Sequence, residues 1–216
     1  MYLDVNHTLF WMDAIRNSED QSRTLEAFWK GQVRSKIWLI ENLKPFVKKS
    51  VKVEIHGGWV GVLASLLFQS GMPISKIVSV DIDSDCEVTA YTMNKLEEIE
   101  GRFEAITANM IDINTNADIV INTSTEHISQ DTYDDWYDKI PYGTMVVIQG
   151  NDFFTCEEHV RCSKDLTEFK SQNHVDDTLF DQSRFDSSRQ DVRVDRAYDA
   201  PTGAMSFNWN SVNVYV

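Results

Sequence analysis

The sequence is short of the residues that mark several classes of protein. Its 216 residues include only three cysteines, four prolines and nine glycines. Cys156 and Cys162 lie six positions apart, which is too far for a short metal-binding pair. An odd cysteine count at this length also argues against a disulfide scaffold, so we expect free thiols in a reducing compartment.

Long apolar runs are absent as well. No stretch approaches the roughly 18 consecutive apolar residues that a membrane span requires. Residues 1–11 lack a basic region followed by an apolar run, so they do not read as a signal peptide. Apolar residues make up 42% of the chain and aromatic residues 11%, which fits a folded domain and excludes wholesale disorder. We expect a cytoplasmic protein without membrane association.

Positive charge is scarce. The chain has 20 Lys and Arg against 34 Asp and Glu, a net charge of −14, so bulk duplex nucleic acid is not an expected partner. The scarcity is uneven, because no lysine follows Lys170 and no glutamate follows Glu168. Residues 171–216 still carry four arginines and seven aspartates. This change in composition separates the last 46 residues from the first 170.

Residues 51–150 alternate between β-branched strands and helical segments. This order predicts an α/β fold with a mostly parallel, Rossmann-like sheet and helices on both faces. We expect strands at 51–55, 77–80, 103–107, 118–122 and 144–149. We expect helices at 8–30, 32–43 (after a break at Gly31), 62–68, 86–100, 133–139 and 162–169. In such sheets the ligand binds beyond the carboxyl ends of the strands.

The chain divides into three regions on this interpretation. Residues 1–50 form an N-terminal helical cap, and residues 51–170 form the Rossmann-like cofactor-binding core. Residues 171–216 are either a divergent hairpin that completes the sheet or an added arm. Residues 205–216 nearly alternate between apolar and polar, which predicts a strand. In an arm, that strand would pair with a sheet edge or with a partner chain.

The ends of the first two predicted strands carry a pattern typical of nucleoside binding. Glu54 ends the first strand, and Gly57, Gly58 and Gly61 form a turn that lets the backbone approach a ligand closely. Asp81 ends the second strand, 20 residues after Gly61, and its two oxygens suit two ribose hydroxyls. The alternative is a tight strand-to-helix turn beside a solvated acid.

Residues 53–61 (VEIHGGWVG) resemble motif I of the class I S-adenosylmethionine-dependent methyltransferases, and residues 80–83 (VDID) resemble the next motif. The resemblance covers roughly residues 25–170. It implies S-adenosylmethionine as cofactor, with the acid and glycines of the turn around it and Asp81 on its ribose. It places Asn109 and Met110 beside the adenine. Segments 122–127, 149–154 and 158–159 are similar to methyltransferase-like proteins of tailed phages and their hosts, which implies the cytoplasm of an infected cell.

Two positions depart from that family's motif. His56 and Val60 stand where the family has glycine. A histidine at a point of close approach could crowd the methionine part of the cofactor. The segment after residue 170 also does not read as the sixth strand and antiparallel seventh strand that complete the family's sheet.

His127 follows the fourth predicted strand and is the candidate general base, with Glu126 orienting it. The alternative is a surface or packing histidine. Asn122 and Ser124 are candidate acceptor ligands, but they could equally cap the helix that follows. Asn151 and His159, in the loop after the fifth strand, are candidates to line the same mouth.

No metal site is predicted. His56, His127 and His159 should all lie at one end of the sheet, but their separations in the sequence exclude a local ligand motif.

The sequence therefore predicts an enzyme that transfers methyl groups from S-adenosylmethionine to a small-molecule, nucleotide or protein acceptor, which it does not identify. The alternative is a catalytically inactive methyltransferase-like binding or structural module. A nicotinamide oxidoreductase is disfavoured, because no G-x-G-x-x-G follows the first strand.

Overall fold

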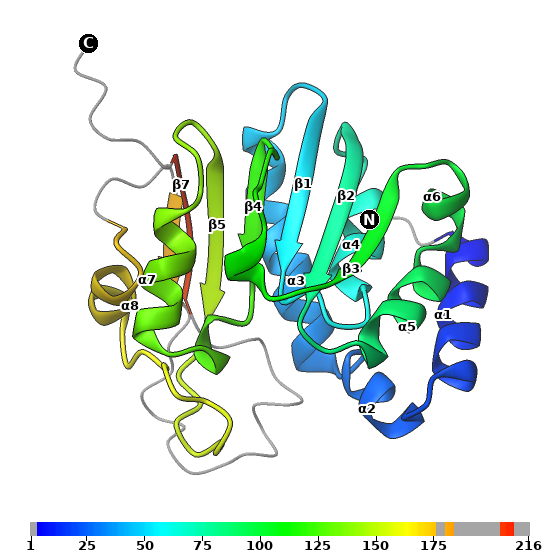
Figure 1. Ribbon diagram of the computed structural model, residues 1–216, viewed down its shortest axis with the longest axis horizontal. Coiled ribbons are helices and arrows are strands. Elements are labelled where there is room, and N and C mark those ends of the chain that lie inside the picture. Colours follow the sequence, from blue (N-terminus) through cyan, green and yellow to red (C-terminus); the bar gives the residue numbers. More distant parts are fainter. Residues whose placement is uncertain (1–3, 176–179, 184–203, 210–216) are drawn as a thin grey trace.

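The computed structural model describes residues 4–175, 180–183 and 204–209, and the description below is confined to them. A single sheet of seven strands runs through the centre, in the order β3-β2-β1-β4-β5-β7-β6 (Figure 1). The strands β1 to β5 are parallel, and β7 runs antiparallel between β5 and β6. The predicted Rossmann-like α/β fold is confirmed. The strands are β1 (Val51–His56), β2 (Ile74–Asp81), β3 (Phe103–Thr107), β4 (Ile119–Asn122), β5 (Met145–Gly150), β6 (Phe180–Ser183) and β7 (Ala204–Trp209).

The helices follow the predicted order with different breaks. They are α1 (Val5–Asn17), α2 (Gln21–Glu26), α3 (Lys30–Leu43), α4 (Val62–Phe68), α5 (Asp85–Met93), α6 (Lys95–Ile99), α7 (Gln130–Asp138) and α8 (Leu166–Gln172). Three single turns of 3-10 helix are η1 (Lys44–Phe46), η2 (Met110–Asp112) and η3 (Thr125–His127). None of the described helices is long and apolar enough to cross a membrane.

The predicted helix over residues 8–30 is wrong in its extent, and so is the break at Gly31. The chain leaves the helix after Asn17 and starts a new one at Asp20, whose side chain accepts a hydrogen bond from the Arg23 amide. Such a cap satisfies an amide that would otherwise lack a partner, so it fixes the start of α2. Gly31 lies inside the first turn of α3, after the N-cap residue Trp29.

The alternating side chains of the strands build two separate apolar layers. Ile119 and Ile121 of β4 pack into a core with helices α1, α3, α4 and α5 on one face. Val120, between them, packs on the other face with Tyr133 and Trp136 of α7 and with residues of α8. Successive strand residues point to opposite faces, so a sheet covered on both sides needs apolar residues at consecutive positions.

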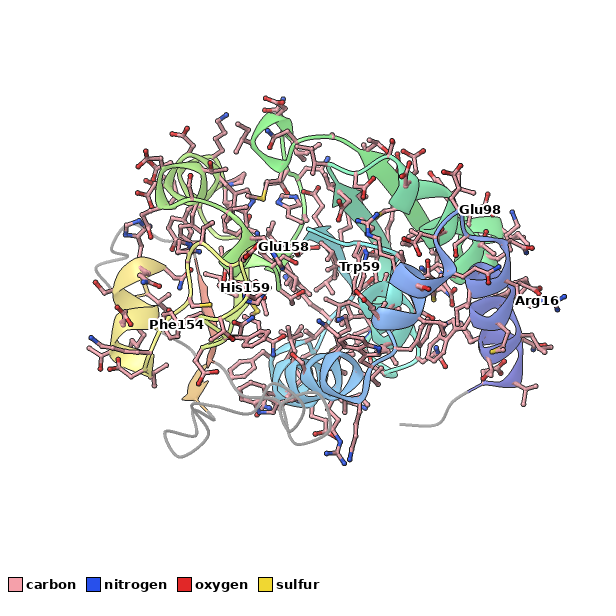
Figure 2. All side chains as sticks on the ribbon, turned by 90° about the horizontal axis from the view of Figure 1, so that it is seen from below. Arg16, Trp59, Glu98, Phe154, Glu158 and His159 are labelled. Atoms are coloured by element: carbon pink, nitrogen blue, oxygen red, sulfur yellow. The ribbon has the colours of Figure 1, made fainter. Side chains whose placement is uncertain are left out.

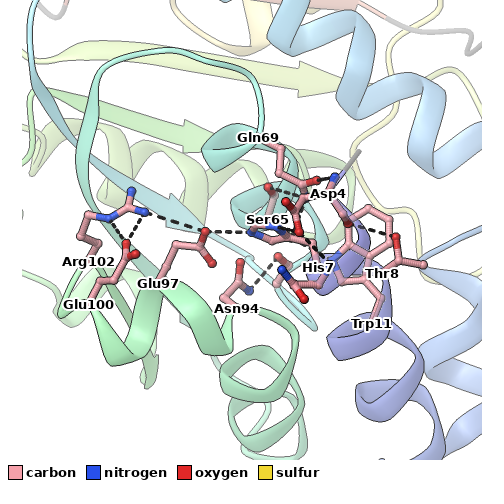
Figure 3. Close-up of polar contacts among 12 residues, drawn as sticks. Asp4, His7, Thr8, Trp11, Ser65, Gln69, Asn94, Glu97, Glu100 and Arg102 are labelled. Carbon is pink, nitrogen blue, oxygen red and sulfur yellow. Dashed lines mark hydrogen bonds and ion pairs between the residues drawn. The ribbon is translucent and has the colours of Figure 1, made fainter. Parts of the chain in front are cut away.

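The helix α1 is attached to the domain by polar contacts at its N-terminal end (Figure 3). The Trp11 indole donates to the Ser65 hydroxyl of α4 at 2.8 Å, and His7 Nε2 lies 2.9 Å from Glu97 Oε1 of α6. Beside them, the Asn94 amide donates to the carbonyl of Gly61 at 3.1 Å. The Trp11–Ser65 bond joins α1 to the helix that follows the glycine turn, and the His7–Glu97 contact joins α1 to α6.

The strands β6 and β7 extend the sheet beyond β5. Residues 204–209 of β7 pair with β5 on one side and with β6 on the other. The strand at the end of the predicted arm therefore pairs within its own chain. The whole segment between β6 and β7, residues 184–203, lies outside the described residues, as do residues 210–216 of the predicted strand.

Candidate cofactor and acceptor site

The carboxyl ends of β1, β2, β4 and β5 meet at the lower edge of the sheet in Figure 1. Figure 2 looks onto this edge, with Trp59 from the turn after β1 and His159 from the loop after β5. The predicted site residues follow these strands, so parallel pairing brings their segments to one end of the molecule.

The glycine turn is held by close packing on three sides. Gly57 and Gly61 have φ angles of +74° and +83°, a region that L side chains rarely adopt. A Cβ atom on Gly58 would lie 1.9 Å from the Ser79 hydroxyl of β2, and one on Gly61 would lie 2.6 Å from the Asn94 amide. One on Gly57 would lie 3.1 Å from Ser124. The turn therefore has to be glycine-rich to sit between β2, β4 and α5.

Asp81 stands directly beside this turn. Its Oδ2 accepts a hydrogen bond from the Trp59 amide at 2.7 Å, and its Oδ1 accepts one from the Asp83 amide at 3.1 Å. A carboxylate oxygen has two lone pairs, so each oxygen keeps the capacity to accept another hydrogen bond, such as one from a hydroxyl. Asp81 is half-buried, and Trp59 has the left-handed φ of +48°. A small open pocket, lined also by Ser79 and Cys86, adjoins both residues.

Glu54 and His56 point away from the turn, into the layer beneath α7. The His56 Nδ1 accepts a hydrogen bond from the Trp136 indole at 2.6 Å, and its ring is 2% exposed. Its Nε2 lies 3.4 Å from Glu54 Oε2. Burial would raise the pKa of Glu54, but the His56 imidazole and the Asn116 amide outweigh it and hold that pKa below its usual value. The unusual histidine of motif I is thus a packed, hydrogen-bonded residue of the core.

The end of β4 lies against the turns on either side of it. The Asn122 Oδ1 accepts from the Ser124 amide at 2.9 Å, and its Nδ2 lies 3.5 Å from the Met110 sulfur. Ser124 lies against Gly57, with its hydroxyl 3.5 Å from the Gly57 carbonyl. Asn109 accepts from the Ile111 amide and so caps η2. These four candidate residues connect the segments after β1, β3 and β4.

Glu126, His127, Asn151 and His159 form a second group. The rings of His127 and His159 are 4.7 Å apart and nearly perpendicular. Asn151 Nδ2 donates to Glu126 Oε1 at 2.7 Å. The amides of Val160 and Arg161 both donate to the Glu126 carbonyl, which fastens the loop after β5 to η3. His127 and His159 are too far apart in the sequence to form a local metal-binding motif, but the fold brings them side by side.

Lys36 is the residue near this group that the sequence interpretation missed. It lies on α3, where Ser35 is hydrogen-bonded to Gln149 at the end of β5. Burial lowers the pKa of Lys36 to about 8, although the nearby Glu126 opposes the shift. Burial also raises the pKa of Glu126 itself. Its spacing could have indicated burial, because Lys36 is three residues after Val33 and four before Ile40 and therefore lies on the predicted apolar stripe.

Two further residues hold the loop after β5 in place. The Arg161 guanidinium lies 4.0 Å above the Tyr133 ring and donates to the Thr125 carbonyl. Cys162 Sγ lies 3.3 Å from Asn151 Oδ1, and burial raises its pKa to about 12. Cys162 is therefore a protonated packing residue at neutral pH, and Asn151 is restrained from two sides.

No known protein family matches the sequence, and no curated protein matches it either. Solved structures do match the fold. NodS, an N-methyltransferase from Bradyrhizobium japonicum WM9 solved with S-adenosyl-L-homocysteine, gives a TM-score of 0.61 at 10% identity, over 94% of this chain and 99% of that one. A variant of MtNAS solved with S-adenosylmethionine gives 0.60 at 10% identity, over 94% and 71%.

The small RNA methyltransferase HEN1 gives a TM-score of 0.63 at 10% identity, over 82% of this chain but only 25% of that one. At such identities the likeness shows the fold alone. The chain has the fold of class I S-adenosylmethionine-dependent methyltransferases, with the antiparallel strand β7 inserted between β5 and β6.

Proposed function

We propose that this protein binds S-adenosylmethionine beside the glycine turn and transfers its methyl group to an acceptor held between η3 and the loop after β5. The observation that carries the proposal is the pairing of Asp81 with the turn, since its Oδ2 lies 2.7 Å from the Trp59 amide. An acid at the end of the second strand, fixed against a glycine-rich turn, is the arrangement that receives a ribose in open α/β folds.

The residues of the chain fit this cofactor. The two oxygens of Asp81 retain acceptor capacity for the ribose hydroxyls, and Gly57 and Gly58 present bare backbone beside them. Asn109 and Met110 stand in the turn after β3, where the adenine would lie. Solved proteins of the same fold carry S-adenosylmethionine or its demethylated product. When bound, the cofactor supplies a methyl group already activated on a sulfonium.

The acceptor side would contribute position and proton transfer. His127 is exposed after β4 and can take a proton from an acceptor hydroxyl or amine, while Asn151 and His159 line the same place. Glu126 is buried and hydrogen-bonded to Asn151, so we propose that it orients Asn151 and His127 and does not contact the acceptor itself. Asn122 and Ser124 are engaged with each other, so we propose that they position the turn beside the acceptor.

Titration calorimetry with S-adenosylmethionine tests the cofactor site. We expect Asp81→Ala to weaken binding by about tenfold or more, because a hydrogen bond to a charged group is worth about 1.5–3 kcal/mol. Asp118→Ala is the matched control, since this aspartate caps the opposite end of the sheet, where its Oδ2 accepts from the Lys52 amide. Absence of binding to the wild-type protein at about millimolar cofactor, or unimpaired binding by Asp81→Ala, would overturn the assignment.

The second candidate is a binding or structural module that keeps the cofactor site but has no turnover. The departures from motif I favour it, because His56 and Val60 stand where active members of the family have glycine. Both candidates predict cofactor binding. Release of S-adenosyl-L-homocysteine in the presence of small-molecule, nucleotide and protein acceptors separates them. We also propose, from segments 122–127, 149–154 and 158–159, that the protein is related to the methyltransferase-like proteins of tailed phages.

A further inference from the structure

Outside the glycine turn, the densest group of ligand-type side chains in the described residues is Glu126, His127 and His159. Each offers one ligand atom, and the three atoms lie within 4.8 Å of one another. Two histidines and a carboxylate are a donor set for divalent first-row transition ions, whereas Mg²⁺ and Ca²⁺ prefer oxygen alone. We propose that these three residues bind one such ion.

The hydrogen bonds of His159 prepare it to be a ligand. Its Nδ1 lies 3.1 Å from the Phe153 carbonyl oxygen, an atom that can only accept. A hydrogen bond to this oxygen requires the proton on Nδ1, and in that tautomer the lone pair of Nε2 is free. Metal-binding histidines almost always donate their second ring nitrogen to a carbonyl or carboxylate in this way.

Glu126 is prepared in a comparable way. It is 8% exposed, and its Oε1 accepts a hydrogen bond from Asn151. Its Oε2 has no hydrogen-bond partner among the residues that the structure describes. A buried carboxylate oxygen without a partner costs free energy, and a bound cation would remove that cost.

The geometry needs only a small adjustment. Ligand atoms about 2.0–2.2 Å from one ion stand about 3–4 Å from one another. The three ligand atoms here lie within 4.8 Å of one another, so they need to move only slightly closer. His127 is exposed and can rotate, whereas Glu126 and His159 are held by Asn151 and Phe153. Three protein ligands leave coordination positions open, as in catalytic metal sites. If the proposed methyl transfer is right, an oxygen of the acceptor would take one of them, and with the ion bound His127 would be a ligand and not the general base.

The test is a titration of the untagged, chelator-treated full-length protein with Co²⁺, followed by visible absorption and calorimetry. We expect one equivalent to bind per chain, with the spectrum of nitrogen and oxygen ligands, and Zn²⁺ and Mn²⁺ to compete. His127→Ala and His159→Ala should each weaken binding by about tenfold or more. The side chain of His127 is exposed, so we expect His127→Ala to fold normally. This variant therefore decides the test even if His159→Ala fails to fold.

Two variants serve as controls. Glu158→Ala removes the acid next to His159 that is not among the three ligands, and His174→Ala removes a histidine that pairs with Asp134 instead. Both should bind Co²⁺ as the wild type does. Failure of the wild type to bind any of the three ions, or equal affinity of the two ligand variants and the wild type, would overturn the proposal. A thiolate-to-cobalt charge-transfer band would overturn the ligand set.

The metal proposal and the methyl-transfer proposal fail separately. The metal titration contains no S-adenosylmethionine, and the cofactor titration of Asp81→Ala is run on metal-free protein. Loss of one result therefore leaves the other intact.

Discussion

The two halves of the sheet carry their candidate chemistry in different ways. In the half formed by β1, β2 and β3, Asp81 accepts a hydrogen bond from the Trp59 amide of the glycine turn, which lies only 22 residues earlier in the chain. In the half formed by β4 and β5, Glu126 and His159 come from two segments that meet only because the strands are neighbours. The first half is organised locally, and the second is organised by tertiary structure.

This contrast predicts that the second half depends more on the end of the chain. Ending the protein after Lys170 removes β6, β7 and the buried residues Asn173 and Val175 beside α7. We expect no soluble folded protein, because the edge of β5 and the core under α7 would both be exposed. Circular dichroism and solubility measure this, with a chain ending at Trp209 as the control. A folded, cofactor-binding remnant would instead support the arm interpretation of residues 171–216.

The next largest effect is expected where the two halves meet, at His56. Changing His56→Gly restores the usual glycine of motif I, but it leaves a cavity and strips the Trp136 indole of its acceptor. We expect a loss of about 2–4 kcal/mol in the free energy of unfolding, with cofactor affinity unchanged. Urea unfolding and calorimetry check both. A variant that is as stable as the wild type and binds the cofactor more tightly would show that His56 obstructs the site.

Gly58 tests the local packing of the first half. Gly58→Ala should destabilise the protein by about 1–3 kcal/mol, because its Cβ would meet the Ser79 hydroxyl at 1.9 Å. The double variant with Ser79→Ala should recover part of the loss, since it removes that oxygen. If the two changes are additive in urea unfolding, the clash is not the cause.

Lys36 gives the smallest effect, and one that depends on pH. Its pKa is about 8 in the folded protein and about 10.5 in the unfolded chain, so folding is penalised while the lysine is charged. Between these values the unfolded chain binds more protons, and stability therefore rises with pH. We expect Lys36→Met to be more stable than the wild type by roughly 1–2 kcal/mol at pH 7. The difference should shrink between pH 8 and pH 10, and a constant difference in urea unfolding would contradict the assignment.

The same contrast explains what the sequence could predict. The succession of the strands β1 to β5 along the chain, and the placement of Asp81 and the glycine turn directly after two of them, follow from short-range patterns and spacing. The grouping of Glu126 with His159 does not, because 32 residues of helix, strand and irregular loop lie between them. Lys36 was also missed, since a charged residue on an apolar helix stripe is normally read as solvent-facing. The role of His56 required the position of Trp136, 80 residues away.

The position of β7 has a consequence for the order in which the sheet can form. Among the described strands, β6 pairs only with β7, although it precedes β7 in the chain. During synthesis β6 therefore emerges before the strand that connects it to β5. The hydrogen-bonding edge of β5 stays open until β7 arrives, and open edges are where chains associate wrongly. A pause in translation between residues 183 and 204 would hold the protein in that vulnerable state.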